Sequence, residues 1–409
     1  MTRPLNDRSP AIILGGPVTG MVVARSLYRA GVPVIALGTD ADHFGRSRCC
    51  VKAVAATGPN IQEQWLRWLL SDAPEGGVVM AASDDGLELI ARHRAELADR
   101  GLRVVESDDE SVLALLDKDR TYEIADRAGV RRPRTCTVRT ADDIGPPLDA
   151  FRFPCGLKAV HRHIFVQRSP ILDKVIVAND RAELELLLRR MVDLELEMQV
   201  TELVEGPDER IVVHTTYLNE RGQPLMEFTH RKLRQRPIHF GVGCYSVGER
   251  LPAVAAEGLR FAQAANVRGM AVTEFKQDPV DGALWLIECN PRFDLSTALV
   301  RSSGFDVAVL SYRRALGLPA NLLGPAKWGR HLWHPVADFN SFLDYRRCGE
   351  LTSAQWVRSL LHRQTFSLFA FDDPGPSLVE EWQSVGRVMV RARKRAGALA
   401  RAGLRPTTS

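Results

Sequence analysis

Three polar side chains end a segment that otherwise has the pattern of a buried strand. In the stretch "WLIECNPRFDL", residues 285–295, three apolar residues are followed by Glu288, Asn290 and Arg292 on alternate positions. Alternate residues of a strand point to the same face of its sheet. The sequence therefore predicts an acid, an amide and a guanidinium group directed toward one place.

The preceding strand carries another acid, Glu274, and the residues from Asp278 to Gly282 between the two strands are typical of a hairpin turn. If paired positions sum to 562, Glu274 lies opposite Glu288, whereas the turn alone permits sums of 561 to 563. The neighbouring registers place the two acids on opposite faces. Facing carboxylates repel each other unless a cation lies between them. Oxygen ligands without His or Cys suit Mg²⁺ or Mn²⁺. The alternative is an amphipathic hairpin with both acids facing solvent.

The composition is that of a soluble globular protein with more than one domain. The chain has 409 residues, 45% of them hydrophobic and 25% charged. With 54 Lys and Arg against 50 Asp and Glu, the net charge of +4 does not by itself indicate a nucleic acid partner. Seven cysteines without a CxxC pair argue against a disulfide framework and a structural zinc site. Because neither a signal core nor a transmembrane run is recognised, we expect a cytoplasmic protein.

Residues 1–115 alternate between strand and helix patterns, which predicts an open α/β domain with a parallel sheet. Its first strand, "AIIL", runs into the loop "GGPVTG" and then a helix. This loop allows an alternative function, a dinucleotide-binding oxidoreductase with Asp40 at a ribose. However, Pro17 stands where the second glycine of the dinucleotide fingerprint is needed, so the sequence favours a tight strand-to-helix turn.

The rest of the chain has two further patterns. In residues 116–325 strands follow strands, which predicts an α+β domain, and residues 326–409 form a helical or irregular extension. The segment 387–405 has seven basic residues, no acid, and apolar residues at helical spacing. It predicts peripheral contact with an anionic membrane or a partner, with a solvated terminal helix as the alternative. The oligomeric state stays open, a homodimer being one alternative.

Four motifs together resemble the ATP-grasp superfamily. They are "FPCGLKAV", "VTELVEGPDE", "VTEFKQD" and "LWLIECNPRF", and their order and spacing match over residues 118 to about 300. Residues 1–115 resemble the α/β domain that usually precedes such a fold, with "MAASDDGLELIA" beside the substrate. "HRKLRQRPIHFGVG" resembles the carboxylate–amine ligase branch that includes D-aspartate ligase.

The resemblance implies a nucleotide site. It assigns the phosphates to Lys118 and Lys158, the adenine amine to Glu202, the adenine ring to the Leu203–Val204 backbone, and the ribose to Asp208 or Glu209. Surface roles are the alternative for Lys118, Lys158 and the acidic turn.

The resemblance also implies a reaction centre. Glu274, Glu288 and Asn290 match metal ligands, while Arg292 and Lys232 match residues that contact the transferred phosphoryl group or the carboxylate. Lys232 lies in a basic stretch that also fits a solvated or phosphate-steering loop.

Two features depart from the family pattern. Cys289 fills a position where a branched aliphatic residue is more usual, and its place on the opposite face of the strand predicts a core residue. His161 and His163 follow Lys158, where the family often has small residues and Pro; they are candidates for a base or for positioning.

The resemblance implies ATP and Mg²⁺, or Mn²⁺, as cofactors and a small carboxylate and an amine as substrates. The expected ligase reaction forms an acylphosphate and releases ADP, after which the amine attacks to form an amide. A non-amine acceptor, an inactive ATP-grasp scaffold and the oxidoreductase are the alternatives. The identity of the acid and the amine is not encoded in any motif that can be read from the sequence.

Overall fold

The computed structural model describes residues 9–39, 43–105, 109–145, 148, 150–160, 165, 168, 169, 175–319 and 325–379. Asp40, His161, His163 and the basic segment 387–405 lie outside these residues. The described residues form two compact units, drawn from Met1–Val112, Arg292–Asn340 and His362–Ser409 for the first and from Leu113–Pro291 and Ser341–Leu361 for the second. The domain boundaries at residues 115 and 325 that the sequence suggests stay a prediction. By their contacts, residues from Arg292 onward belong to the first unit again.

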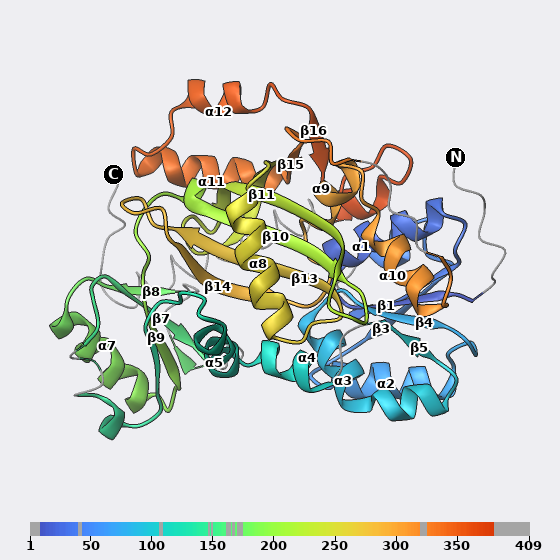
Figure 1. The fold of residues 1–409 in the computed structure, drawn as a ribbon, viewed down its shortest axis with the longest axis horizontal. Helices are drawn as coiled ribbons and strands as arrows, with labels where there is room; N and C mark the ends of the chain where they lie inside the picture. Colours follow the sequence, from blue (N-terminus) through green and yellow to red (C-terminus); the bar gives the residue numbers. More distant parts are fainter. Residues whose placement is uncertain are drawn as a thin grey trace, which may run out of the picture. The chain divides into compact units, whose positions relative to one another are not determined.

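The first unit is built on a parallel sheet, as the alternating strand and helix patterns predicted (Figure 1). The strand order is β3-β2-β1-β4-β5. The strands are β1 (Ala11–Leu14), β2 (Val34–Thr39), β3 (Lys52–Ala56), β4 (Val78–Ala81) and β5 (Arg103–Val104). The central strand β1 is fully buried, which explains its uninterrupted apolar sequence. Strand β3 was not predicted, because it is an edge strand with mostly exposed side chains.

Helices of the first unit alternate with these strands and return near its end. They are α1 (Pro17–Arg29), η1 (Phe44–Arg46), α2 (Ile61–Ser71), α3 (Asp84–Asp99), α9 (Thr297–Ser302) and α10 (Val307–Ala315). Ser83 caps α3, and its side chain accepts a hydrogen bond from the Gly86 amide. Two short parallel strands, β15 (His331–Trp333) and β16 (Gln364–Phe366), interrupt the extension that was expected to be helical or irregular.

A small antiparallel sheet forms one part of the second unit. Its order is β6-β9-β7-β8, with β6 (Thr135–Val138), β7 (Cys155–Ala159), β8 (Ile176–Ala178) and β9 (Met198–Glu202). Helix α7 (Arg181–Asp193) packs on it through Leu184, Leu188 and Met191, which share one helical face and the core of the sheet. The 3₁₀ turn η2 (Ala141–Asp143) follows β6.

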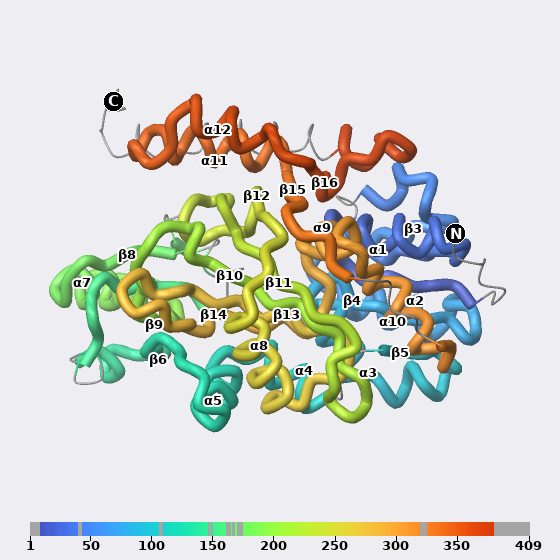
Figure 2. The backbone as a smooth tube through the Cα atoms, turned by 45° about the horizontal axis from the view of Figure 1, so that its top comes forward, coloured from blue at the N-terminus to red at the C-terminus, as the bar shows by residue number. Residues whose placement is uncertain are grey.

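A larger antiparallel sheet forms the other part, with its strands in the order β14-β13-β10-β11-β12. These strands are β10 (Ile211–Leu218), β11 (Pro224–Arg236), β12 (Val242–Gly248), β13 (Gly269–Gln277) and β14 (Leu284–Asn290). Helix α8 (Pro252–Ala264) runs over β10, β11, β13 and β14 (Figures 1 and 2). A Cβ at Gly258 would lie 2.4 Å from the His214 ring, so glycine permits this close packing.

The core of the larger sheet lies on the face that α8 and α5 (Lys118–Ala128) cover. Phe261, Phe275 and Leu286 are fully buried there. The other helical elements of the described residues include η4 (Asp208–Arg210) and α12 (Ser353–Ser359), both in the second unit. The residues of α4 (Asp109–Leu116) and α11 (Pro335–Arg347) are divided between the two units. No helix in the described segments is long and apolar enough to span a membrane.

Candidate active site

The hairpin of β13 and β14 places its two acids directly opposite each other. Glu274 pairs with Glu288, and Val272 pairs with Asn290. Nearer the turn the register differs: Lys276 pairs with Trp285, and the shift lies between Glu274 and Phe275. Continuing the register of the turn would have put Glu288 on the opposite face from Glu274. A β-bulge therefore brings the two carboxylates onto one face.

The pattern of burial along β14 follows this bulge. Leu286 and Cys289 both lie in the core beneath α8, although they are three positions apart rather than two. Burial raises the pKa of the Cys289 thiol to about 12, so this group is a poor nucleophile at neutral pH. The expected core position of Cys289 is confirmed, and its neighbours Glu288 and Asn290 are left partly exposed.

Lys232 reaches the same place from β11. Its ammonium donates to the Glu274 carboxylate, and both side chains are mostly buried, with 13% and 12% exposed. The Asn290 amide nitrogen donates to Glu288 Oε1 at 3.0 Å. The structure thus brings together Lys232, Glu274, Glu288 and Asn290, as the sequence motifs suggested.

This donor set fits a hard divalent cation. Two facing carboxylates and an amide supply oxygen ligands, which hard divalent cations prefer. Lys232 offsets part of the negative charge at Glu274.

Arg292 follows two residues later and belongs to the first unit. Its Nε donates to Asp84 Oδ1 at 2.6 Å, and its Nη1 donates to the Phe293 carbonyl at 3.1 Å. Asp84 is the first residue of α3 and lies in the stretch expected beside the substrate. Asp84 was not predicted as a functional residue, because an acid that follows a helix cap is too common a signal.

The two lysines assigned to the phosphates lie at ends of elements in the second unit. Lys158 stands near the end of β7, paired across the sheet with Gln199, and makes no ion pair with a described residue. Lys118 is the first residue of α5, after the cap Asp117, whose side chain accepts from the amides of Asp119 and Arg120. Its position at a helix N-terminus adds to a local preference for anions.

The segment after β9 contains the residues expected at adenine. Glu202 Oε1 accepts from the Arg152 amide at 2.8 Å. The Leu203 amide donates to the Pro154 carbonyl at 3.1 Å, so it is already used within the small sheet. Val204 follows without a backbone hydrogen bond to another described residue.

Of the two acids considered for ribose, Asp208 is 2% exposed and has protein partners. It accepts from the Tyr345 hydroxyl and, at 3.0 Å, from the His239 amide. Burial by itself raises the pKa of the Asp208 carboxyl, but these hydrogen bonds outweigh it and hold that pKa below its usual range. Glu209, in contrast, is exposed.

No family model matches the sequence. The carbamoyl phosphate synthase large chain of Xylella fastidiosa is 26% identical over 265 residues, which cover 60% of this chain and 22% of that protein. This chain thus matches only about a fifth of the length of that relative. Among solved structures, the ADP complex of N5-carboxyaminoimidazole ribonucleotide synthetase has a TM-score of 0.60 at 14% identity, covering 80% of this chain and 82% of that one. The L-amino acid ligase from Bacillus licheniformis has a TM-score of 0.58 at 17% identity, covering 76% and 75%.

The chain has the ATP-grasp fold. The predicted fold class, an open α/β domain followed by an ATP-grasp fold, is thereby confirmed. At these low identities the structural likeness is one of fold, so the assignment of individual residues depends on the geometry of this chain.

Within the ATP-grasp fold, three sets of contacts involve predicted site residues. The acidic edge joins Lys232 to Glu274, Glu288 and Asn290. The small sheet joins Lys158 to the strand that ends in Glu202. Arg292 donates to Asp84 within the first unit.

Proposed function

We propose that this protein is an ATP-dependent carboxylate–amine ligase, of the kind that resembles D-aspartate ligase, acting on a small carboxylate and an amine. The observation that carries the proposal is the bulged pairing of Glu274 with Glu288, with Asn290 on the same face and Lys232 on Glu274. The fold supports it, because two of its structural neighbours are described as a synthetase bound to ADP and an amino acid ligase.

In this proposal the acidic edge holds Mg²⁺ through Glu274, Glu288 and Asn290. When bound, the ion neutralises charge on the phosphates of ATP. Lys118 and Lys158 hold the α- and β-phosphates by charge-assisted hydrogen bonds. Lys232 and Arg292 face the transferred phosphoryl group or the carboxylate, for which their ammonium and guanidinium groups are suited.

For the nucleoside, we propose that Glu202 accepts from the adenine amine and that Val204 supplies the backbone contact. Glu209 is the better candidate at ribose, because the Asp208 carboxylate is buried and already bonded to Tyr345 and His239. Asp208 then has a structural role, because its hydrogen bonds to Tyr345 and His239 hold this segment in place.

The chemistry assigned to the protein is positioning and charge stabilisation. The substrate carboxylate attacks the γ-phosphorus, the bond to the bridging oxygen breaks, and ADP leaves. The amine then attacks the acyl carbon, phosphate leaves, and the amine proton passes to solvent or a base. Such a reaction depends mainly on alignment and electrostatics.

The test is a product assay with a panel of small carboxylates, ATP and Mg²⁺, with hydroxylamine in place of the amine. We expect ADP, phosphate and a hydroxamate, and an ¹⁸O label in the acid should pass to the phosphate. AMP as the only nucleotide product would contradict the acylphosphate route. A bound nicotinamide or flavin would support the oxidoreductase alternative.

A further inference from the structure

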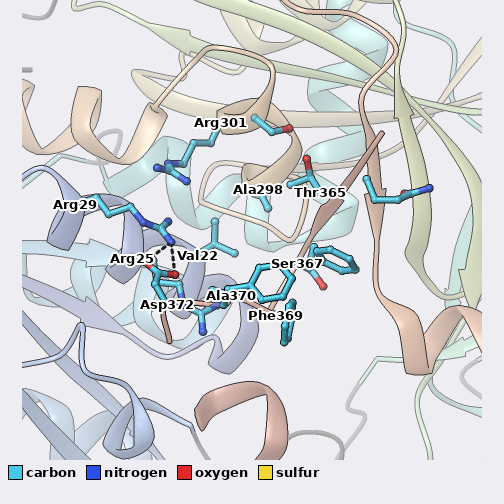
Figure 3. A pocket seen from close by; sticks show the side chains of 14 residues that line it. Val22, Arg25, Arg29, Ala298, Arg301, Thr365, Ser367, Phe369, Ala370 and Asp372 are labelled. Carbon is cyan, nitrogen blue, oxygen red and sulfur yellow. Dashed lines mark hydrogen bonds and ion pairs between the residues drawn. The ribbon is translucent and has the colours of Figure 1, made fainter. Parts of the chain in front are cut away.

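The first unit contains a cavity of about 460 Å³, within the range typical of small-molecule sites. Helix α1, helix α9 and the segment from β16 to Asp372 enclose it (Figure 3). Its lining combines cationic and aromatic side chains: Val22, Arg25, Arg29, Ala298, Arg301, Ser302, Gln364, Thr365, Phe366, Ser367, Phe369, Ala370, Phe371 and Asp372.

The three arginines of this cavity differ in what they already bind. Arg25 is buried and fully engaged: Nε donates to Asp373, Nη1 to the Leu368 carbonyl and Nη2 to the Asp373 carbonyl. Arg29 uses only Nη2, which contacts both oxygens of Asp372 at 3.0 and 3.1 Å (Figure 3). Arg301 uses only Nε, which donates to Asp306 at 3.2 Å.

Two guanidinium groups therefore keep donors that no described residue accepts. They are Nε and Nη1 of Arg29 and both terminal nitrogens of Arg301. Ser367 is a third polar group of the cavity lining that could donate to a ligand. It is 2% exposed, and its hydroxyl has no hydrogen-bond partner among the described residues. A buried hydroxyl without a partner is unfavourable, so a ligand that accepts from it would be stabilised.

One side of the cavity is lined by phenylalanine rings, which favour contact with an apolar group. Phe369 lies edge-to-face with Phe366 and with Phe371, at 5.5 and 4.8 Å between ring centroids. Phe371 is 88% exposed, so its position at the cavity is not explained by burial in the core. A flat apolar group would cover these rings and remove them from water.

Within the first unit, this cavity lies away from Arg292 and its partner Asp84. Helix α1 begins beside Gly16, whose Cβ would meet Ala82, and Asp84, the partner of Arg292, follows two residues after Ala82. The cavity residues Val22 to Arg29 lie about 9 to 20 Å further along the helix axis, at the usual rise per residue.

We propose that this cavity binds a small carboxylate with an aromatic or other flat apolar body. Arg29, Arg301 and Ser367 would receive the carboxylate, for which the guanidinium fork is suited, and the phenylalanines would receive the body. A singly charged head fits better than a phosphate because the Asp372 carboxylate lines the same cavity and would repel a second negative charge. The site and its test are independent of the proposed ligase activity.

The probe is phenylacetate, titrated by calorimetry into the full chain without ATP. We expect saturable binding at millimolar concentrations, and weaker binding of acetate, of neutral phenylacetamide and of phenyl phosphate. Arg301→Gln and Arg29→Gln should each weaken phenylacetate binding about tenfold or more, because each removes a charge-assisted contact. Arg92→Gln, at an arginine of α3 that is 58% exposed and pairs with Glu88, is the matched control and should bind as wild type.

Phe371→Ala tests the apolar side without risk to the fold, since the ring is exposed, and should also weaken binding severalfold. Its control is Val280→Ala, at an apolar side chain that is 94% exposed in the turn after β13. The proposal is overturned if wild type does not bind phenylacetate, if phenyl phosphate binds more tightly, or if the cavity variants bind it as wild type does. It is equally overturned if Arg292→Gln alone abolishes binding, which would place the probe at the reaction centre.

Discussion

Two strand ends in this molecule have sequences that suggest a ligand, and they differ in how closely the chain packs against them. At the end of β14, the side chains of Glu288 and Asn290 are partly exposed beside Glu274. At the end of β1, the loop with Gly15 and Gly16 is closed by the chain itself. A Cβ at Gly15 would lie 2.2 Å from Ser83 Oγ, and one at Gly16 would lie 2.1 Å from the Ala82 carbonyl.

The difference teaches how to interpret such motifs. Glycines show only that other atoms approach the backbone closely. Here those atoms belong to Ala82 and Ser83, which follow β4. Carboxylates that face each other are unfavourable unless positive charge lies beside them, and Lys232 supplies one such charge at Glu274. The hairpin motif therefore carries more information about function than the glycine loop.

The largest effect should come from Glu288→Gln. It removes one of two charged ligands, so Mn²⁺ affinity measured by electron paramagnetic resonance in the presence of ADP should fall by more than about a hundredfold. ADP formation should be lost with it. Glu227→Gln, on β11 and paired with His214, is the control and should keep its affinity. Unchanged Mn²⁺ binding in a folded Glu288→Gln protein would remove the distinction between the two strand ends.

Lys158→Ala should have the next largest effect. Loss of a charge-assisted phosphate contact is worth about 1.5–3 kcal/mol, so ATP should bind about tenfold or more weakly by calorimetry. Adenosine has no phosphates and should bind both proteins alike. Equal ATP affinity in the two proteins would show that the phosphates do not lie on the small sheet.

Gly16→Ala should lower stability without changing nucleotide or metal binding. The positive φ of Gly16, +66°, is unfavourable for alanine, and the contact with Ala82 adds a clash, so we expect a loss of about 1–3 kcal/mol or more in the free energy of unfolding. Gly31→Ala is the matched control, because φ is +82° there but no atom lies within 4 Å of the added Cβ. Equal losses in urea unfolding would mean that close packing is not why Gly16 is glycine.

The smallest effect is expected at Asp208 and His239. These two residues support the segment that carries Glu209, the acid proposed at ribose. The hydrogen bond to Asp208 raises the pKa of His239 against the opposing effect of burial, while the pKa of Asp208 is lowered. Stability from the raised His239 pKa is lost as pH rises through its folded value, and stability from the depressed Asp208 pKa is lost as pH falls through its folded value. The pair should thus stabilise most between the usual values of about 4 and 6.5.

His239→Asn should therefore destabilise the protein more between about pH 4 and pH 6.5 than in mild alkali. Asparagine is chosen because it tolerates the positive φ of 68° at this position. Urea unfolding across this range of pH measures the difference. A constant loss at every pH would show that the ion pair between His239 and Asp208 contributes nothing.

Much of the fold could be predicted because its signals are local. The alternation of strands and helices in the first unit, the cap at Ser83 and the stop of α5 at Gly129 depend on neighbouring residues alone. The short strands β15 and β16 could not be predicted, since each has three residues and they pair across about thirty positions of sequence.

By itself, the sequence determined which residues of the site could bind cations and phosphates, because residue type and order decide that chemistry. Only the tertiary structure decided where they point. The bulge after Glu274 sets the face of Glu288, and a one-residue shift would reverse it. Burial beneath Tyr345 separates Asp208 from Glu209, which are adjacent in sequence. The cavity of Arg29, Arg301 and Ser367 exists because three distant segments pack together, and no local pattern encodes such a meeting.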